Sequence, residues 1–167
     1  QRQVMRMRIE QLDIRDEITA SQIWRLQHAA YAVEANLTGF LNLPPLMDTI
    51  ESIRNCGEIF YGVRSDENDP LSDIIAAIAY ETEDERATIC RMMVHPDYFR
   101  RGIARLLITH VEALVPHVKE IIVSTGSKNE PAVRLYESMG FRFTREWMPV
   151  LGLRVSEFHK FVDKGAV

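Results

Sequence analysis

The sequence lacks the features that would assign it to several specialised classes of protein. Its 167 residues include only two cysteines, Cys56 and Cys90. Each lies in or beside an apolar segment, so both are expected to be reduced, core-type thiols of a cytoplasmic protein. No apolar run approaches the roughly eighteen residues of a membrane-spanning helix, and no segment has the pattern of a signal peptide. These absences argue against a disulfide-rich secreted domain and against a membrane protein.

Several motifs for catalysis and binding are also missing. The chain contains no Gly-x-Ser-x-Gly elbow, no Walker loop and no Gly-x-Gly-x-x-Gly turn, which argues against the common hydrolase, NTPase and Rossmann classes. Its five histidines are not spaced with cysteines or carboxylates as zinc ligands are, so we expect no metal site. A net charge of −4 gives no basic excess, and we expect no nucleic-acid partner.

What remains is the pattern of an ordinary folded domain. Hydrophobic residues make up 46% of the chain and charged residues 26%, with no linker or repeat, so residues 1–167 are expected to form a single domain. Apolar residues alternate in some segments and recur every three to four positions in others, which predicts a mixed α/β sheet. The expected strands are 5–14, 58–63, 74–82, 86–94, 120–124, 141–147 and 153–162. The expected helices are 19 or 21 to about 35, then 49–55, 102–114 and 129–139.

Local signals sharpen three of these elements. Asp48 is expected to cap the helix over 49–55, and a hairpin turn is expected around Glu83 and Asp84. The helix over 102–114 is expected to bury one apolar stripe. That stripe consists of Ile103, Leu106, Leu107, Val111 and Leu114.

The most informative segment lies between the strand over 86–94 and the helix that follows it. The strand stops before Pro96, a basic turn with Arg100, Arg101 and Gly102 follows, and then the helix starts. Such a turn directs free main-chain N–H groups and the positive end of the helix dipole at one place. The segment therefore predicts an anion site, best suited to the phosphates of a cofactor.

This turn resembles the cofactor-binding signature of the GNAT superfamily of N-acetyltransferases, which is Gln or Arg, two residues, Gly, one residue, then Gly or Ala. A second stretch, Asn129-Glu-Pro-Ala-Val-Arg-Leu-Tyr136-Glu-Ser-Met-Gly-Phe141, is similar to the second motif of the same family. The resemblance covers residues 74–141. One position departs from the family pattern, because Phe99 stands where the signature has Gln or Arg, which removes one expected phosphate contact.

The resemblance implies a mixed, mostly antiparallel sheet of six to seven strands, with helices on both faces and splayed central strands. It also implies acetyl-CoA as cofactor and transfer of an acetyl group to a primary amine, on a small molecule or a protein, by direct attack. The main chain of residues 92–94 would pair with the pantetheine, and the amides of 101–105 would surround the diphosphate. The implied cofactor-binding residues are Met92, Met93, Val94, Arg100, Arg101, Gly102, Ile103, Ala104, Arg105, Asn129, Ala132 and Tyr136.

The same resemblance assigns catalytic roles. Tyr136 would protonate the leaving thiolate, and the N–H of Val94 would polarise the thioester carbonyl. The position where the family often has a glutamate base is Thr88, which cannot serve. The general base therefore stays open among Glu81, Glu83, Glu85 and water.

The acceptor site and the partners are less defined. Trp24, Tyr31, Glu34, Phe40 and the loop over 146–149, with Trp147, are the expected acceptor contacts. A homodimer through the last strands is a further expectation, and the sequence does not identify the amine. The alternatives are a CoA-binding sensor or scaffold without catalysis, and a nucleotide-binding regulator.

Overall fold

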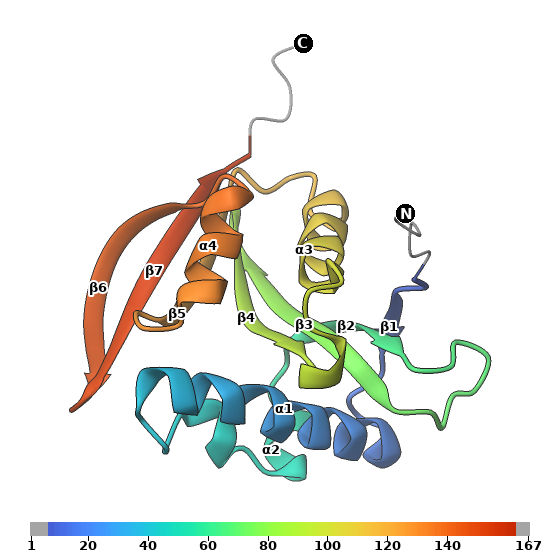
Figure 1. The fold of residues 1–167 in the computed structure, drawn as a ribbon. Helices are drawn as coiled ribbons and strands as arrows, with labels where there is room; N and C mark the ends of the chain where they lie inside the picture. Colours follow the sequence, from blue (N-terminus) through green and yellow to red (C-terminus); the bar gives the residue numbers. More distant parts are fainter. Residues whose placement is uncertain (1–6, 163–167) are drawn as a thin grey trace.

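In a computed structural model that describes residues 7–162, seven strands form one sheet in the order β1-β2-β3-β4-β5-β7-β6 (Figure 1). All neighbouring strands are antiparallel except β4 and β5, which are parallel. The sheet therefore matches the predicted mostly antiparallel architecture. The strands are β1 Glu10–Leu12, β2 Ile59–Arg64, β3 Ile74–Glu83, β4 Arg86–Val94, β5 Glu120–Gly126, β6 Arg142–Val150 and β7 Leu153–Phe161.

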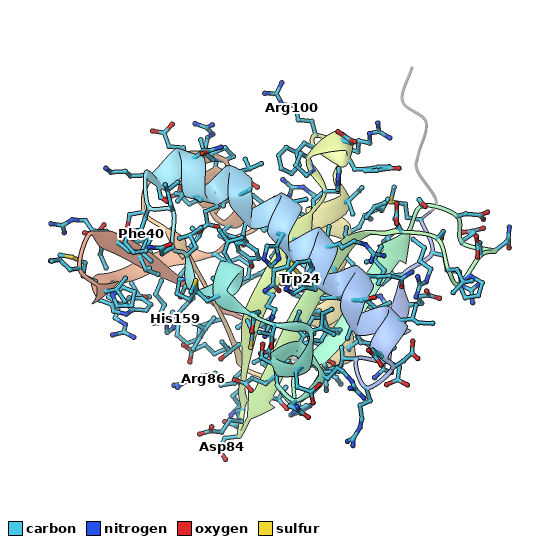
Figure 2. The ribbon with its side chains drawn as sticks, turned by 90° about the horizontal axis from the view of Figure 1, so that it is seen from below. Trp24, Phe40, Asp84, Arg86, Arg100 and His159 are labelled. Atoms are coloured by element: carbon cyan, nitrogen blue, oxygen red, sulfur yellow. The ribbon has the colours of Figure 1, made fainter. Side chains whose placement is uncertain are left out.

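Helices cover the sheet on both faces, as predicted. They are α1 Glu17–Thr38, α2 Ile50–Arg54, α3 Ile103–Leu114 and α4 Glu130–Ser138, with short 3-10 turns η1 Pro44–Met47 and η2 Pro96–Tyr98. One apolar cluster joins α3 and α4 to the sheet, and a second joins α1 and α2 to the opposite face. Figure 2, seen from below, shows α1 running across the strands. Within residues 7–162 no helix is long and apolar enough to cross a membrane.

The predicted order of elements is confirmed, but several boundaries were wrong. The strand predicted over 5–14 shrinks to Glu10–Leu12 among the described residues, and residues 5 and 6 lie outside them. Asp16 caps α1 by accepting the N–H of Thr19, so the helix starts earlier than predicted, and it ends later, at Thr38. The hairpin predicted around Glu83 and Asp84 is confirmed, and its turn consists of residues 84–85, where Asp84 takes a left-handed conformation with a φ of 56°.

The predicted cap of α2 was also wrong. Thr49 is the N-cap, and it shares a reciprocal capping box with Ser52. Asp48 lies one residue too early to cap the helix. Its carboxylate instead accepts a hydrogen bond from the hydroxyl of Ser52 at 2.7 Å and pairs with a buried arginine of β4.

The buried stripe of α3 was predicted only in part. Ile103, Leu107 and Val111 are buried as expected, and Ile108 joins them. Leu106 and Leu114 are 40% and 38% exposed. At 100° per residue, Leu106 falls outside the arc centred between Leu107 and Val111, whereas Ile108 lies on the other flank of that arc. Leu114 lies in the last turn of the helix.

Candidate functional site

The strands β4 and β5 separate partway along their length. They pair only from Arg86 with Glu120 to Ile89 with Val123. Beyond that point Cys90 is an extra residue in β4, because Ala79 of β3 pairs with Arg91 while the next residue pairs with Ile89. Such a bulge bends the strand that carries it. The result is the predicted splay, and Figure 1 shows the two strands diverging toward α1.

The main chain of β4 presents alternate residues to this gap. The N–H of His95 donates to the carbonyl of Ile75 at 2.8 Å, so the main-chain groups of His95 point toward β3. Because these groups alternate along an antiparallel strand, those of Met93, two residues earlier, also point toward β3. The N–H groups of Met92 and Val94 therefore face the gap. That of Met92 donates to the hydroxyl of Tyr31 at 3.4 Å. A ligand in the gap would find hydrogen-bonding groups on Met92 and Val94, but not on Met93.

The turn before α3 is open where a phosphate would need to approach. Arg100 and Gly102 have left-handed φ values of 64° and 77°. Gly102 is the N-cap without a side-chain hydrogen bond, and nothing lies within 4 Å of the place where a Cβ would stand. The first N–H groups of α3 are thus free of any side-chain cap. The residues present fit a diphosphate at this helix start.

The arginine side chains in and after this turn differ in their contacts. Figure 2 shows Arg100 pointing away from the fold. The guanidinium of Arg101 lies 5.0 Å from the ring centre of Tyr98. Arg105 donates to the hydroxyl of Ser138 at 2.8 Å and so joins α3 to α4. The side chain of Ile103 is buried in the core, so only its main chain can face a ligand.

The second motif places Asn129 and Tyr136 on the β5 side of the gap. Asn129 caps α4 by accepting the N–H of Ala132, and Ala132 packs against the core. Tyr136 is buried with its ring 5.9 Å from that of Phe141. Burial raises the pKa of Tyr136 above its ordinary value, with smaller contributions from Tyr31 and Glu34, so its hydroxyl keeps its proton.

Glu34 of α1 reaches the same place from the opposite face of the sheet. Its carboxylate accepts the N–H of Gly126, at the end of β5, and the side-chain amide of Asn129, both at 3.3 Å. Burial raises the pKa of Glu34, and the two hydrogen bonds offset this only in part. The sequence predicted Glu34 only as an acceptor contact, because nothing in its neighbourhood along the chain indicates that it meets α4.

The three glutamates predicted as possible bases lie elsewhere. Glu81, Glu83 and Glu85 are exposed at the β3–β4 turn, where they line a cleft of about 890 Å³ together with Ser124 and Trp147. Of the other expected acceptor contacts, Trp24 donates its indole N–H to the carbonyl of Asp48, between η1 and α2. Phe40 packs against a small apolar cluster that is separate from the two main ones.

The cysteine in the bulge, Cys90, has a thiol with a raised pKa. Burial, together with the charges of Glu58 and Glu81, raises the pKa of the Cys90 thiol to about 12. A thiol with this pKa is protonated at neutral pH and reacts poorly. The thiol of Cys90 is therefore a poor candidate for an acyl-cysteine intermediate.

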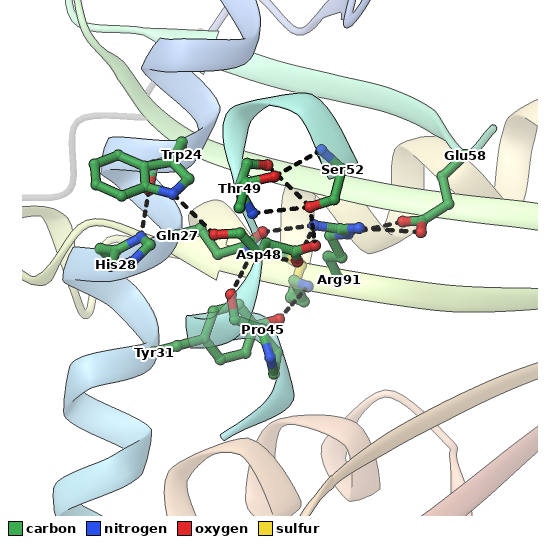
Figure 3. Close-up of polar contacts among 11 residues, drawn as sticks. Trp24, Gln27, His28, Tyr31, Pro45, Asp48, Thr49, Ser52, Glu58 and Arg91 are labelled. Carbon is green, nitrogen blue, oxygen red and sulfur yellow. Dashed lines mark hydrogen bonds and ion pairs between the residues drawn. The ribbon is translucent and has the colours of Figure 1, made fainter. Parts of the chain in front are cut away.

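A polar cluster that the sequence did not predict lies beside the gap (Figure 3). Arg91 of β4 is buried and pairs with both carboxylate oxygens of Glu58, at 2.9 and 3.2 Å. It also donates to Asp48 and to the amide oxygen of Gln27, both at 2.9 Å. We call these four residues the Arg91 cluster. It ties α1 and the segment before α2 to the middle of β4, next to the residues that face the gap.

Comparisons with known proteins identify the family of this chain. Residues 17–141 match the family model described as the acetyltransferase (GNAT) family. The chain is 35% identical over 153 residues to the UPF0157 protein YqkA of Bacillus subtilis. This match covers 92% of the chain but only 43% of YqkA, so the chain spans less than half the length of that relative. The chain is 32% identical over 115 residues to the ribosomal protein bS18-alanine N-acetyltransferase of Escherichia coli K12, covering 68% of this chain and 72% of that protein.

Solved structures show the same fold. The crystal structure of the E. coli ribosomal-protein-S18-alanine N-acetyltransferase superposes with a TM-score of 0.73 over 95% of this chain and 96% of that one, at 15% identity. The PaiA N-acetyltransferase of Thermoplasma acidophilum, solved in complex with coenzyme A, has a TM-score of 0.66 over 95% and 100% of the two chains, at 16% identity. This chain belongs to the GNAT family of acetyltransferases, as its motifs predicted.

Proposed function

We propose that this chain transfers an acetyl group from acetyl-CoA to a primary amine, and that the amine is the amino terminus of a protein or peptide. The gap between β4 and β5 carries the proposal, because the main chain of β4 presents Met92 and Val94 to it beside an uncapped helix start. Family membership supports the reaction. The activity named for the E. coli relative, on an alanine of a ribosomal protein, supports this class of acceptor.

The acyl donor would lie along β4. Its pantetheine arm would take hydrogen bonds from Met92 and Val94 as an added strand does. Its diphosphate would meet the amides of residues 101–105, where Gly102 lets the main chain approach closely. Asn129 and Ala132 would border the donor from α4. The cytoplasmic location and the homodimer stay predictions.

The transfer then needs three events at the gap. The amine loses a proton, its nitrogen attacks the thioester carbonyl carbon, and the carbon–sulfur bond breaks. The N–H of Val94 would polarise the carbonyl oxygen, and the buried hydroxyl of Tyr136 would protonate the departing sulfur. The raised pKa of the Cys90 thiol argues against an acyl-cysteine intermediate, so the acetyl group would pass directly between donor and acceptor.

An assay of free thiol release tests the reaction and the acceptor class together. We expect release with acetyl-CoA and a peptide that has a free alanine at its amino terminus, and none with the same peptide acetylated there. Release with a polyamine but not with the peptide would contradict the proposed acceptor. Tight acetyl-CoA binding without release from any amine would indicate a binding module instead.

The donor site has a matched pair of variants. Gly102→Glu adds bulk and a negative charge where the diphosphate would lie, and should weaken acetyl-CoA binding at least tenfold in calorimetry. Gly57→Glu is the control, because Gly57 also has a left-handed φ, of 76°, and open space around it, but lies between α2 and β2. Equal affinities of the two folded variants would place the diphosphate elsewhere.

A further inference from the structure

Helix α1 bridges the two strands that separate at the gap. Tyr31 and Glu34 are three residues apart and therefore lie on one face of the helix. Tyr31 contacts β4 through the N–H of Met92, and Glu34 contacts the end of β5 and the start of α4. Gly126 permits this close approach, because a Cβ there would lie 2.6 Å from Thr38 and 3.3 Å from the carboxylate of Glu34.

The carboxylate of Glu34 differs from the other inward-facing carboxylates of the described chain. Glu58 and Asp48 pair with Arg91, and Glu157 pairs with Arg145 and His159. Glu34 has only neutral N–H donors in residues 7–162. The titratable groups near it are the phenols of Tyr31 on α1 and Tyr136 on α4, and Arg91 and Glu58 act on that of Tyr31. A cation would therefore complete the charge balance at Glu34.

The glutamates of the β3–β4 turn lie farther from the gap than Glu34 does. Glu81 pairs with Thr88, four residues before Met92. Ile78 of β3 pairs with Met92, so the main chain of Glu81 lies three residues, or about 10 Å, farther along the strand. Glu83 and Glu85 lie farther still. A base must come within about 3 Å of the proton that it removes, or act through one water. Glu34, by contrast, borders the gap itself.

We propose that Glu34 binds the ammonium form of the acceptor and takes its proton. This inference rests on the proposed function. One proton passes from the ammonium to the Glu34 carboxylate, and the neutral nitrogen then forms the bond to the carbonyl carbon. As the carbon–sulfur bond breaks, the sulfur takes the proton of Tyr136, and the nitrogen returns its excess proton to the phenolate. Glu34 later releases its proton to solvent, so the sum is amide, free thiol and one proton.

The two residues would act in sequence through their charges. The negative charge of Glu34 is one of the influences that hold the pKa of Tyr136 high. Once Glu34 has taken a proton, this charge is gone, and the pKa of Tyr136 falls at the stage when the sulfur needs a proton. Deprotonation of the amine thus prepares the acid for the second half of the reaction.

The variant Glu34→Gln tests the proposal, because it keeps the size of the side chain and removes its basicity. At pH 7 we expect kcat/KM for the peptide to fall by about 10² to 10³, within the range for a lost general base. The affinity for acetyl-CoA should stay within twofold. Glu137→Gln is the matched control on exposed α4 surface beside Tyr136, and should leave kcat/KM within twofold.

The pH profile separates proton transfer from a structural role. An α-amino group has an ordinary pKa of about 8. The wild-type protein should reach a plateau in kcat/KM below this pH, because Glu34 removes the proton, and should lose activity as the pH falls through a value above 4.5. Glu34→Gln should lack the plateau and rise steadily to about pH 8, so its defect shrinks with pH. The wild-type profile alone supplies this test if the variant does not fold.

Three results would overturn the inference. They are an unchanged rate in folded Glu34→Gln, a defect that is constant from pH 6 to 9, and a wild-type profile without the plateau. Each of them leaves the proposed function intact as long as the wild-type protein releases thiol. Absence of release from every amine in the wild-type protein would instead overturn the proposed function, and this inference with it.

Discussion

Two polar sites beside α1, the Arg91 cluster and Glu34, differ in how their charges are paired. Arg91 donates hydrogen bonds to two carboxylates and an amide oxygen, so all three nitrogens of its guanidinium have partners. Glu34 is partly shielded from water, yet in the described residues it meets only the main chain of Gly126 and the amide of Asn129. A charge that is fully paired holds the fold together. A partly shielded carboxylate without a cationic partner is free to bind a cation and to exchange a proton.

The largest effect on stability should come from breaking the paired site. Arg91→Met leaves the partly buried carboxylates of Glu58 and Asp48 without their cation, and should lower the free energy of unfolding by about 2–4 kcal/mol. Urea denaturation measures this. Arg134→Met, an exposed position on α4, is the control and should change it by less than about 0.5 kcal/mol. The double variant Arg91→Met/Glu58→Gln should recover part of the loss; no recovery would mean that packing, not charge, stabilises this cluster.

At the second site, around Glu34, we expect a variant to lose activity and keep its stability. Tyr136→Phe removes the hydroxyl beside Glu34 but keeps the buried ring. Thiol release at saturating substrates should fall about 10²-fold or more, while unfolding and acetyl-CoA affinity change little. Stopped assays and calorimetry on the same preparation measure both. A variant that loses stability and affinity in proportion to turnover would assign Tyr136 to the core and not to catalysis.

A smaller effect should follow from pushing α1 away from β5. Gly126→Ala places a methyl group 2.6 Å from Thr38 Cγ2 and 3.3 Å from the Glu34 carboxylate. We expect a loss of about 1–3 kcal/mol in unfolding free energy and a reduced rate, because Glu34 moves. Thr38→Ser in the same chain removes the closer contact and should restore part of both. Rescue of stability without rescue of rate would separate the packing of α1 from the position of Glu34.

The smallest effect concerns the other contact of α1 at the gap. Tyr31→Phe removes the acceptor for the N–H of Met92. A donor bound along β4 would then no longer compete with Tyr31, and its affinity should rise by a few-fold, the worth of roughly one ordinary hydrogen bond. Titration calorimetry with acetyl-CoA measures this. A clear loss of affinity would show that the Tyr31 hydroxyl holds the donor itself.

The sequence predicted the parts of the molecule that depend on local pattern. Alternation and helical spacing gave the order of elements, and the turn with Gly102 gave the open helix start. Leu106 was misplaced because apolar spacing alone does not tell which flank of a helix faces the sheet.

The Arg91 cluster was not predicted, and Glu34 was predicted only as an acceptor contact, because the partners of both sites are far apart along the chain. Arg91 meets residues 33, 43 and 64 positions away, and Glu34 meets residues 92 and 95 positions away. The sequence left the general base open among Glu81, Glu83, Glu85 and water, because these glutamates lie in the hairpin before the signature, and that assignment stays a prediction. The bulge at Cys90 and the crossing of α1 put a different carboxylate at the gap.

A crystal structure with a bisubstrate compound, in which coenzyme A is joined to the amino terminus of a peptide, tests the central claim most directly. We predict the pantetheine between β4 and β5, bonded to Met92 and Val94, with the peptide nitrogen within hydrogen-bonding distance of the Glu34 carboxylate. A nitrogen beside Glu81, or a Glu34 covered by the pantetheine and out of reach of the peptide, would contradict the account.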